Sequence, residues 1–399
     1  MNDNTSGLDL RTPLRYTIVT FFIWGLAYGL LDVLNKHFQE ILHVGKAQSA
    51  WLQIAYFGAY LTMSIPAGML MHARGYKFGI LTGLTVAAGG AFLFIPAANA
   101  VSFPFFVGAM FVLATGLCFL ESSADTYMNV LGAPEHAERR LNLAQSFTGL
   151  GGFFGPMIGG AAFFGGTAAS GEELHSVQLT YGVIGALILL FAGLVARANL
   201  PEIQAVTLTA GGAERPLSSR RHFVLGVLTQ ALYVGAQVGI GAYFINCVTE
   251  TWQDLTSQQG AFMLSVATLL YLIGRFSTTW LMTRFEPRRI LTTYGVINVI
   301  LSVIVVLGVE KISAIALIAI YFFMSTMFAT TFTLGIKDLG AQTKRGSSLM
   351  VMAIGGGVLL PYPMGMIADS FGTPASFLLP AACFVLVAWY GWRGAEVRS

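Results

Sequence analysis

Two acidic side chains stand four residues apart in the stretch from Gly116 to Tyr127, which is otherwise apolar enough to cross a bilayer. Residues at positions i and i+4 share one face of a helix, so Glu121 and Asp125 are expected to face the same neighbour. Ionisable groups at the centre of a membrane helix cost roughly 2.5–3.5 kcal/mol each and usually mark an ion or substrate path. We therefore interpret this stretch as part of a transport site.

The two carboxylates admit different roles. Glu121 has no Lys or Arg within several turns of its own helix, and an apolar setting favours the neutral form of an isolated carboxyl group. We expect Glu121 to bind and release a proton near neutral pH, with a buried structural hydrogen bond as the alternative. Asp125 is equally consistent with a second relay carboxylate and with an ion-pair partner for Arg139 or Arg140 at the end of the span.

Two further charges fall within apolar segments. Asp32 is placed near the outer end of the first segment, on a face shared with Tyr28, and we expect it to face a cavity, where water can reach it from the periplasm. The alternative is a carboxylate in the interfacial water. Arg275 is the only cation well inside a span, and we expect it to serve as a structural counter-ion, although a functional role stays open.

Polar and aromatic side chains recur at helical spacing in three other segments. Gln145 belongs to a narrow polar stripe that includes Asn142, Gly149 and Gly152, and the remaining candidates are Gln53, Tyr56 and Tyr60 in the second span and Tyr233 and Gln237 in the seventh. Amides and aromatic rings together suit a polar, uncharged ligand such as a sugar, which offers hydroxyl edges and apolar faces. Ordinary helix packing is the alternative reading.

Composition places these groups in a polytopic membrane protein. The chain of 399 residues is 55% hydrophobic and only 10% charged, with a mean hydropathy of +0.69. Its charges lie between apolar spans rather than in one patch, so they indicate topology and give no support to nucleic-acid binding. Cys118, Cys247 and Cys383 have no metal or redox spacing, and no Walker or zinc motif occurs, so we expect no enzyme activity, metal or cofactor.

Twelve membrane spans are predicted when each crossing must contain about 20 mostly apolar residues. They cover roughly residues 15–35, 48–71, 78–97, 103–127, 140–164, 178–197, 222–247, 258–282, 288–308, 312–334, 346–368 and 374–393. Of the Lys and Arg residues, eighteen fall on the side of both termini and three on the other. This asymmetry predicts cytoplasmic termini.

An internal repeat divides the chain in two. A shift of 205 residues superposes five positions: Arg140 on Arg345, Gly151 on Gly356, Gly152 on Gly357, Pro156 on Pro361 and Gly160 on Gly365. We therefore predict an all-α major facilitator fold, with residues 1–197 and 222–399 as six-helix halves joined by a cytoplasmic linker at 198–221. In such a fold the substrate sits near the midplane between the halves, and glycines allow close helix approach.

Several motifs resemble the fucose, galactose and hexose proton symporters of the major facilitator superfamily. The resemblance covers nearly the whole chain, and it is carried most specifically by Arg139-Arg-Leu-Asn-Leu-Ala-Gln-Ser-Phe147, by Phe119-Leu-Glu121 and by Gln53 to Tyr60. It implies that Asp32 and Glu121 match the two membrane carboxylates of fucose-type members and that Gln145 matches a polar residue of the sugar site. Where the family carries asparagines, this chain has Tyr28, Gly29 and Thr148, which changes the sugar-contacting faces.

The sequence thus predicts a proton-coupled symporter that imports a monosaccharide or sugar derivative across the bacterial inner membrane by alternating access. The proton is the expected coupling ion, the lipid bilayer and a sugar are the expected partners, and the protein is expected to act as a monomer. Two alternatives remain: an exporter or antiporter of another small polar compound, and a sensor that does not transport.

Overall fold

The computed structural model describes residues 11–131, 137–165, 173–201, 216–339 and 342–396. Within these ranges the ordered elements are all helical, and twelve segments are long and apolar enough to cross a membrane. The first six are α1 (Arg11–Ile41), α3 (Trp51–Arg74), α4 (Tyr76–Asn99), α5 (Phe103–Val130), α6 (Ala137–Phe164) and α7 (Glu173–Arg197). A short helix, α2 (Lys46–Ser49), connects α1 to α3.

The last six segments are less regular than the first six. They comprise α8 (Arg221–Thr251), α9 (Ser257–Leu281), α10 (Pro287–Val306), α11 (Glu310–Met324) with α12 (Met327–Ile336), α13 (Thr343–Met352) with η4 (Ala353–Val358) and α14 (Pro361–Phe371), and α15 (Thr373–Ser376) with α16 (Leu378–Trp389) and η5 (Tyr390–Gly394). Each predicted span overlaps one of these twelve segments, so the prediction of twelve crossings is confirmed.

Three of the last six spans are interrupted where the sequence predicted continuous helices, and the twelfth span breaks at Phe377. The tenth breaks at Ser325 and Thr326, and the Tyr233 hydroxyl of α8 donates a 2.8 Å hydrogen bond to the Met324 carbonyl beside the break. In the eleventh, η4 contains three consecutive glycines and is followed by Pro361 at the start of α14. Glycine and proline weaken an α-helix, and broken membrane helices persist where other groups satisfy the freed backbone.

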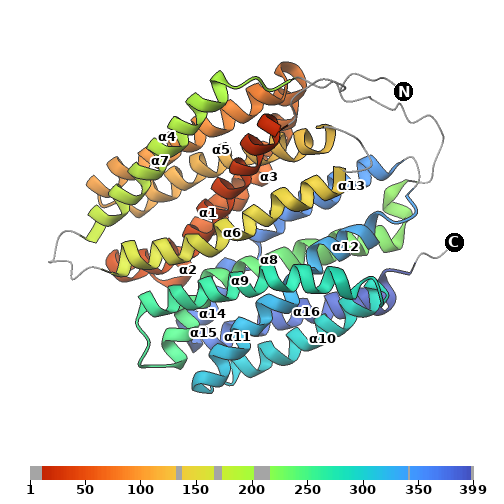
Figure 1. Cartoon of the computed structure of the whole chain (residues 1–399). Helices are drawn as coiled ribbons and strands as arrows, with labels where there is room; N and C mark the ends of the chain where they lie inside the picture. Colours follow the sequence, from red (N-terminus) through yellow and green to blue (C-terminus); the bar gives the residue numbers. More distant parts are fainter. Residues whose placement is uncertain (1–10, 132–136, 166–172, 202–215, 340–341, 397–399) are drawn as a thin grey trace.

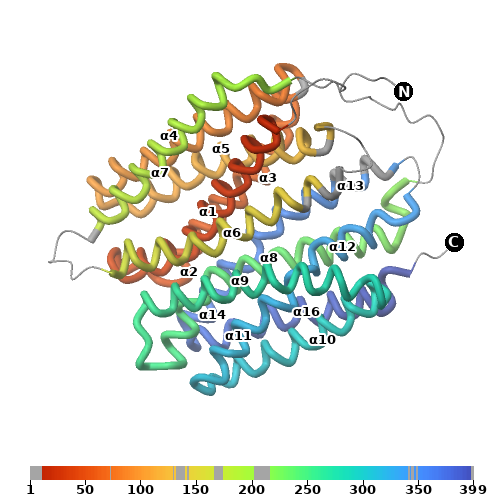
Figure 2. The backbone as a smooth tube through the Cα atoms, in the orientation of Figure 1, coloured from red at the N-terminus to blue at the C-terminus, as the bar shows by residue number. Residues whose placement is uncertain are grey.

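The helices gather in two groups. In Figure 1, α1 and α3–α7 occupy one side of the molecule and α8–α16 the other, and the tube in Figure 2 shows the same division. The first helix begins and the last helix ends at the same end of the bundle, which we call the terminal end. We call the opposite end the distal end. The main contacts between the groups join α1 to α8, α6 to α9, α3 to η4 and α2 to α14.

Glycines bring neighbouring helices together within each group. A β-carbon placed on Gly116 of α5 would lie 2.6 Å from the Cα atom of Ala87 in α4, and one on Gly155 of α6 would lie 2.7 Å from the Cα atom of Gly29 in α1. These separations leave no room for a side chain. Of the glycines in the internal repeat, Gly151 and Gly356 make the predicted close approach to a neighbouring backbone, whereas Gly152 does not. The three cysteines are buried and unbridged, as expected for small core residues.

The contact at Gly116 generates a stability prediction. Gly116→Ala should lower the free energy of unfolding by about 1–3 kcal/mol, because the added methyl group forces α4 and α5 apart. Gly108→Ala on the same helix is the matched control, since a β-carbon there meets nothing within 4 Å. Thermal unfolding in detergent would measure both variants, and equal melting temperatures would contradict the close packing of α4 on α5.

Candidate functional site

Asp32 lies between the two groups of helices, deeper than the sequence predicted. Its side chain is only 6% exposed, and a β-carbon on Gly241 of α8 would lie 2.5 Å from its Oδ2 atom. The predicted access of water to Asp32 does not hold in this conformation, and α1 continues for another nine residues beyond Asp32 to Ile41. The fully buried Gln53 amide of α3 lies beside the Asp32 carboxyl group.

Glu121 and Asp125 are electrostatic neighbours on α5, as their spacing predicted. Both side chains are half-buried, and the Tyr60 side chain of α3 lies beside the Glu121 carboxyl group. Tyr60 in turn accepts a hydrogen bond from the indole nitrogen of Trp24 on α1. Trp24 thus positions Tyr60 beside Glu121, and both interpretations of Asp125 stay predictions.

Three tyrosines connect the surroundings of Asp32 to those of Glu121. The ring of Tyr28 lies 6.1 Å from that of Tyr56, which stacks on the ring of Tyr60 at 5.4 Å, centroid to centroid. Tyr28 has the Asp32 carboxyl group as an electrostatic neighbour, and Tyr60 has Glu121. The predicted aromatic and amide groups of α1 and α3 therefore form one continuous cluster between the two carboxyl groups.

The helices of the second group complete this cluster with residues that the sequence analysis missed. Tyr271 of α9 lies beside the Tyr233 hydroxyl, and Tyr321 of α11 has both Asp32 and Tyr271 as electrostatic neighbours. Tyr271 could have been found, because it lies one helical turn before Arg275 and so shares its face. Tyr321 carries no such signal, since it precedes Phe322 and Phe323 in a uniformly apolar segment.

Arg275 does not pair with a carboxylate in the part of the chain that the structure describes. Its guanidinium carbon lies 5.7 Å from the centroid of the Tyr271 ring, a cation–π arrangement, and the side chain is half-buried. Among the described residues, the predicted role of Arg275 as the structural counter-ion of a carboxylate is therefore wrong. The aromatic ring, rather than an acidic side chain, compensates the cation.

Two predicted amides are available to a ligand. Gln145 of α6 and Gln237 of α8 are half-buried, and neither side chain hydrogen-bonds another residue in the described ranges. Gln237 lies one turn before Gly241, the residue that contacts Asp32, so it faces the first group of helices. Thr148 differs, because its hydroxyl donates a 3.3 Å hydrogen bond to the Phe21 carbonyl of α1.

At the distal end, the short helix α2 fastens the first group to the second. The backbone amides of Lys46 and Ala47 each donate a 2.9 Å hydrogen bond to the Asp369 carboxylate of α14. The Lys46 ammonium group forms a 2.6 Å ion pair with Glu250 of α8, and Glu250 also accepts hydrogen bonds from the amide and hydroxyl of Thr373. We call these five residues the distal latch.

Further contacts between the groups lie alongside the distal latch. Asn35 donates to the Ala242 carbonyl at 2.9 Å, and Asn246 donates to the Gln39 side chain at 2.6 Å. Ser257 donates to Glu40. The hydrogen bonds and the ion pair that cross between the groups thus extend from the Asp32 region to the distal end, so the structure represents a conformation closed on that side.

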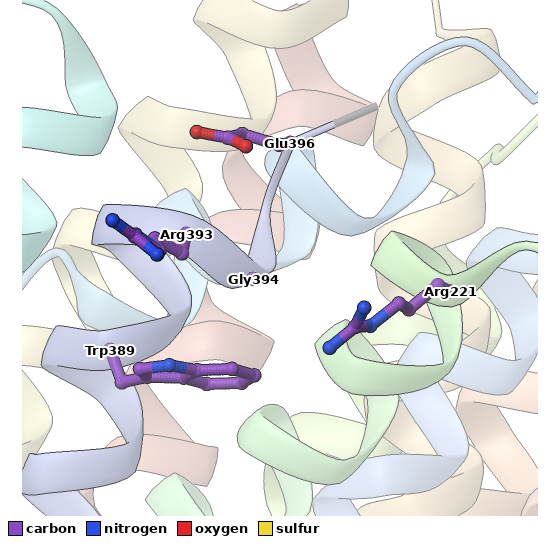
Figure 3. Close-up of a pocket in the computed structure, with 5 residues that line it drawn as sticks. All are labelled: Arg221, Trp389, Arg393, Gly394 and Glu396. Atoms are coloured by element: carbon purple, nitrogen blue, oxygen red, sulfur yellow. The ribbon is translucent and has the colours of Figure 1, made fainter. Parts of the chain in front are cut away.

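A cavity of about 180 Å³ opens elsewhere, at the terminal end between the start of α8 and the end of the chain's last helix. Its lining consists of Arg221, Trp389, Arg393, Gly394 and Glu396, of which Arg221 and Trp389 face the gap from opposite walls (Figure 3). None of these was a predicted site residue. Among the described residues, no three His, Cys, Asp or Glu side chains gather as a metal site would require.

Comparison with known proteins identifies relatives over almost the whole chain. A family model described as Major Facilitator Superfamily matches residues 17–353. The chain is 35% identical over 400 aligned residues to the L-fucose-proton symporter of Escherichia coli (strain K12), covering 94% of this chain and 91% of the relative. It is 33% identical over 398 residues to the glucose/galactose transporter of Brucella abortus biovar 1 (strain 9-941), covering 99% and 97%.

A solved relative has the same architecture. The crystal structure of FucP, a major facilitator superfamily transporter in the outward conformation, superposes with a TM-score of 0.69 at 34% identity and covers 96% of this chain and 98% of its own. The family resemblance and the all-helical fold predicted from the sequence are thereby confirmed.

The distal latch generates a conformational prediction. Glu250→Gln preserves the shape of the side chain but removes the ion pair with Lys46, which contributes about 1 kcal/mol, so the ratio of open to closed molecules at the distal end should rise roughly fivefold. Spin labels at two exposed distal positions, Ala100→Cys and Phe371→Cys, would report this change as a larger population of long distances.

The matched control is Glu286→Gln, which removes the exposed ion pair between Glu286 and Arg289 at the start of α10. That variant should leave the distance distribution unchanged. An identical distribution in Glu250→Gln and the parent would show that the distal latch does not hold the two groups together.

Proposed function

The chain belongs to the Major Facilitator Superfamily, and we propose that it is a proton-coupled symporter that imports a monosaccharide or sugar derivative by alternating access. One observation carries the proposal: Asp32 and Glu121 flank a single cluster of tyrosine and amide side chains that both groups of helices contribute. Proton binding and substrate binding would therefore act on the same interface.

Alternating access requires the two groups to move against each other. We propose that residues 1–197 and 222–399 are the moving halves and that residues 198–221 link them; of this linker, residues 202–215 lie outside the described part of the chain. The Lys and Arg distribution supports a cytoplasmic location for the terminal end in the bacterial inner membrane. With this orientation, the closed distal end is the periplasmic side.

Asp32 can couple a proton to that closure. In the closed conformation its carboxyl group is buried against Gly241, and no cation pairs with it among the described residues. An ionised carboxylate without a partner is costly in such a place, whereas the neutral acid can hydrogen-bond to nearby amide and backbone groups. Protonation of Asp32 therefore favours distal closure, and loss of the proton favours reopening.

The polar lining suits an uncharged polyol. The amides of Gln145 and Gln237 can both donate and accept hydrogen bonds, which matches the hydroxyl groups of a sugar, and the rings of Tyr28 and Tyr271 can cover its apolar face. We propose no cofactor beyond the coupling proton, no enzymatic step and no nucleic-acid partner, and we expect the monomer to be the transporting unit.

The direct test is proton movement with sugar uptake. When L-fucose or D-galactose is added to lightly buffered cells or right-side-out vesicles, the outside medium should become alkaline, because each sugar enters with a proton. An uncoupler should abolish accumulation of the sugar. Uptake that depends on sodium and leaves the external pH unchanged would refute proton symport.

Glu121 provides a second test of coupling. Glu121→Gln mimics the protonated acid and keeps a polar side chain of the same size beside Tyr60, so proteoliposomes should still exchange sugar in counterflow. Uphill accumulation should fall to an inside-to-outside ratio of about 1, because no proton is bound and released in each cycle. Asp32→Asn should lose accumulation for the same reason.

Glu286→Gln is a suitable control, because Glu286 is exposed at the start of α10 and pairs with Arg289 of the same helix rather than with the tyrosine cluster. It should accumulate sugar as the parent does. If Glu121→Gln also accumulates sugar against a gradient, Glu121 is not a coupling residue.

A further inference from the structure

One glycine in the bundle is buried and yet borders empty space. In the described part of the chain, a β-carbon placed on seven glycines meets no atom within 4 Å. Six of them are exposed or half-exposed: Gly58, Gly68, Gly89, Gly108, Gly193 and Gly308. Only Gly152 of α6 is buried. Solvent or lipid can occupy the space at the six others, whereas the space at Gly152 is internal.

The neighbouring glycines on α6 locate this space. A β-carbon on Gly149 would lie 2.8 Å from the Leu272 side chain of α9, and one on Gly151 would lie 2.6 Å from the Leu26 amide nitrogen of α1. The Thr268 hydroxyl of α9 donates a 3.2 Å hydrogen bond to the Gly152 carbonyl. The space is therefore bounded by α1, α6 and α9.

Helical periodicity connects the space to the candidate site. Seven residues make almost two full turns of a helix, so Gly152 lies directly along the helix from Gln145, whose amide has no protein partner in the described ranges. A ligand that hydrogen-bonds Gln145 would extend along this line toward Gly152.

The internal repeat shows what can fill such a position. Gly357 is the counterpart of Gly152 in the second half, and a β-carbon there would lie 2.6 Å from the ring of Phe57 in α3. On that side a phenyl ring occupies the space beside the glycine. At Gly152 the helix across the interface provides only Thr268, a much smaller side chain, and the corresponding space is left unfilled.

We infer that Gly152 determines the size of the sugar that the site accepts, because its missing side chain makes room for the ring substituent of a hexose. This inference rests on the proposed function. A methyl group at this position would clash with no protein atom and would reduce only the volume left for substrate.

The test compares sugars that differ only in the substituent at C5. The pairs are L-fucose with D-arabinose and D-galactose with L-arabinose, and the readout is kcat/KM in counterflow. In Gly152→Ala the ratio of the larger to the smaller sugar should fall about tenfold or more, the usual effect of one methylene group in a binding pocket. Gly152→Ser, of similar size, should shift the ratio in the same direction.

Two glycines serve as controls. Gly193→Ala on α7 also meets nothing within 4 Å but is exposed, so it should leave both the ratio and the melting temperature unchanged. Gly151→Ala should lower the melting temperature, because its methyl group would meet the backbone of α1. Gly152→Ala should unfold at the temperature of the parent.

The possible outcomes test the role of Gly152 separately from the proposed symport. An unchanged ratio in Gly152→Ala, an equal loss of both sugars, or a lower melting temperature would overturn the role of Gly152 while leaving symport intact. If the parent protein shows no proton-coupled uptake of any of these sugars, the proposed function fails instead.

Discussion

The structure depends on a carboxyl group that is buried where the two groups of helices meet. Asp32 is 6% exposed and lies against the backbone of Gly241, and no Lys or Arg side chain among the described residues forms an ion pair with it. Burying an ionised group without a partner is costly, so the closed conformation and the protonation state of Asp32 cannot vary independently. The absence of a side chain at Gly241 is what allows this contact to form.

Small residues serve two opposite purposes in this fold. Gly116, Gly151 and Gly155 remove side chains so that helices can pack closely, and a β-carbon at any of them would strike a neighbouring backbone. Gly152 lies one residue from Gly151 but faces space that no helix fills. Because adjacent residues on a helix point about 100° apart, one glycine-rich stretch can supply both a packing face and a binding face.

The sequence predicted the twelve spans well, because hydrophobic length follows directly from composition. The division into two moving halves and the coupling roles of Asp32 and Glu121 stay predictions. The first helix is longer than its apolar run, since α1 continues past Asp32 through Lys36 and Glu40, which pair with each other. Tyr271 lies one helical turn before its partner Arg275, so the sequence could have revealed that contact. The position of Tyr321 and the distal latch depend on contacts between distant segments, which one sequence without an alignment does not reveal.

The distal latch and Asp32 act on one equilibrium from different positions. The ion pair between Lys46 and Glu250 and the hydrogen bonds to Asp369 favour closure whatever the protonation state, whereas an ionised Asp32 opposes it. A ligand or proton can shift such an equilibrium only by its differential affinity for the two states, typically a few kcal/mol. The latch must therefore be weak enough for one proton to outweigh it. Partly exposed ion pairs, with side chains 20% and 33% accessible, meet that requirement better than a buried network would.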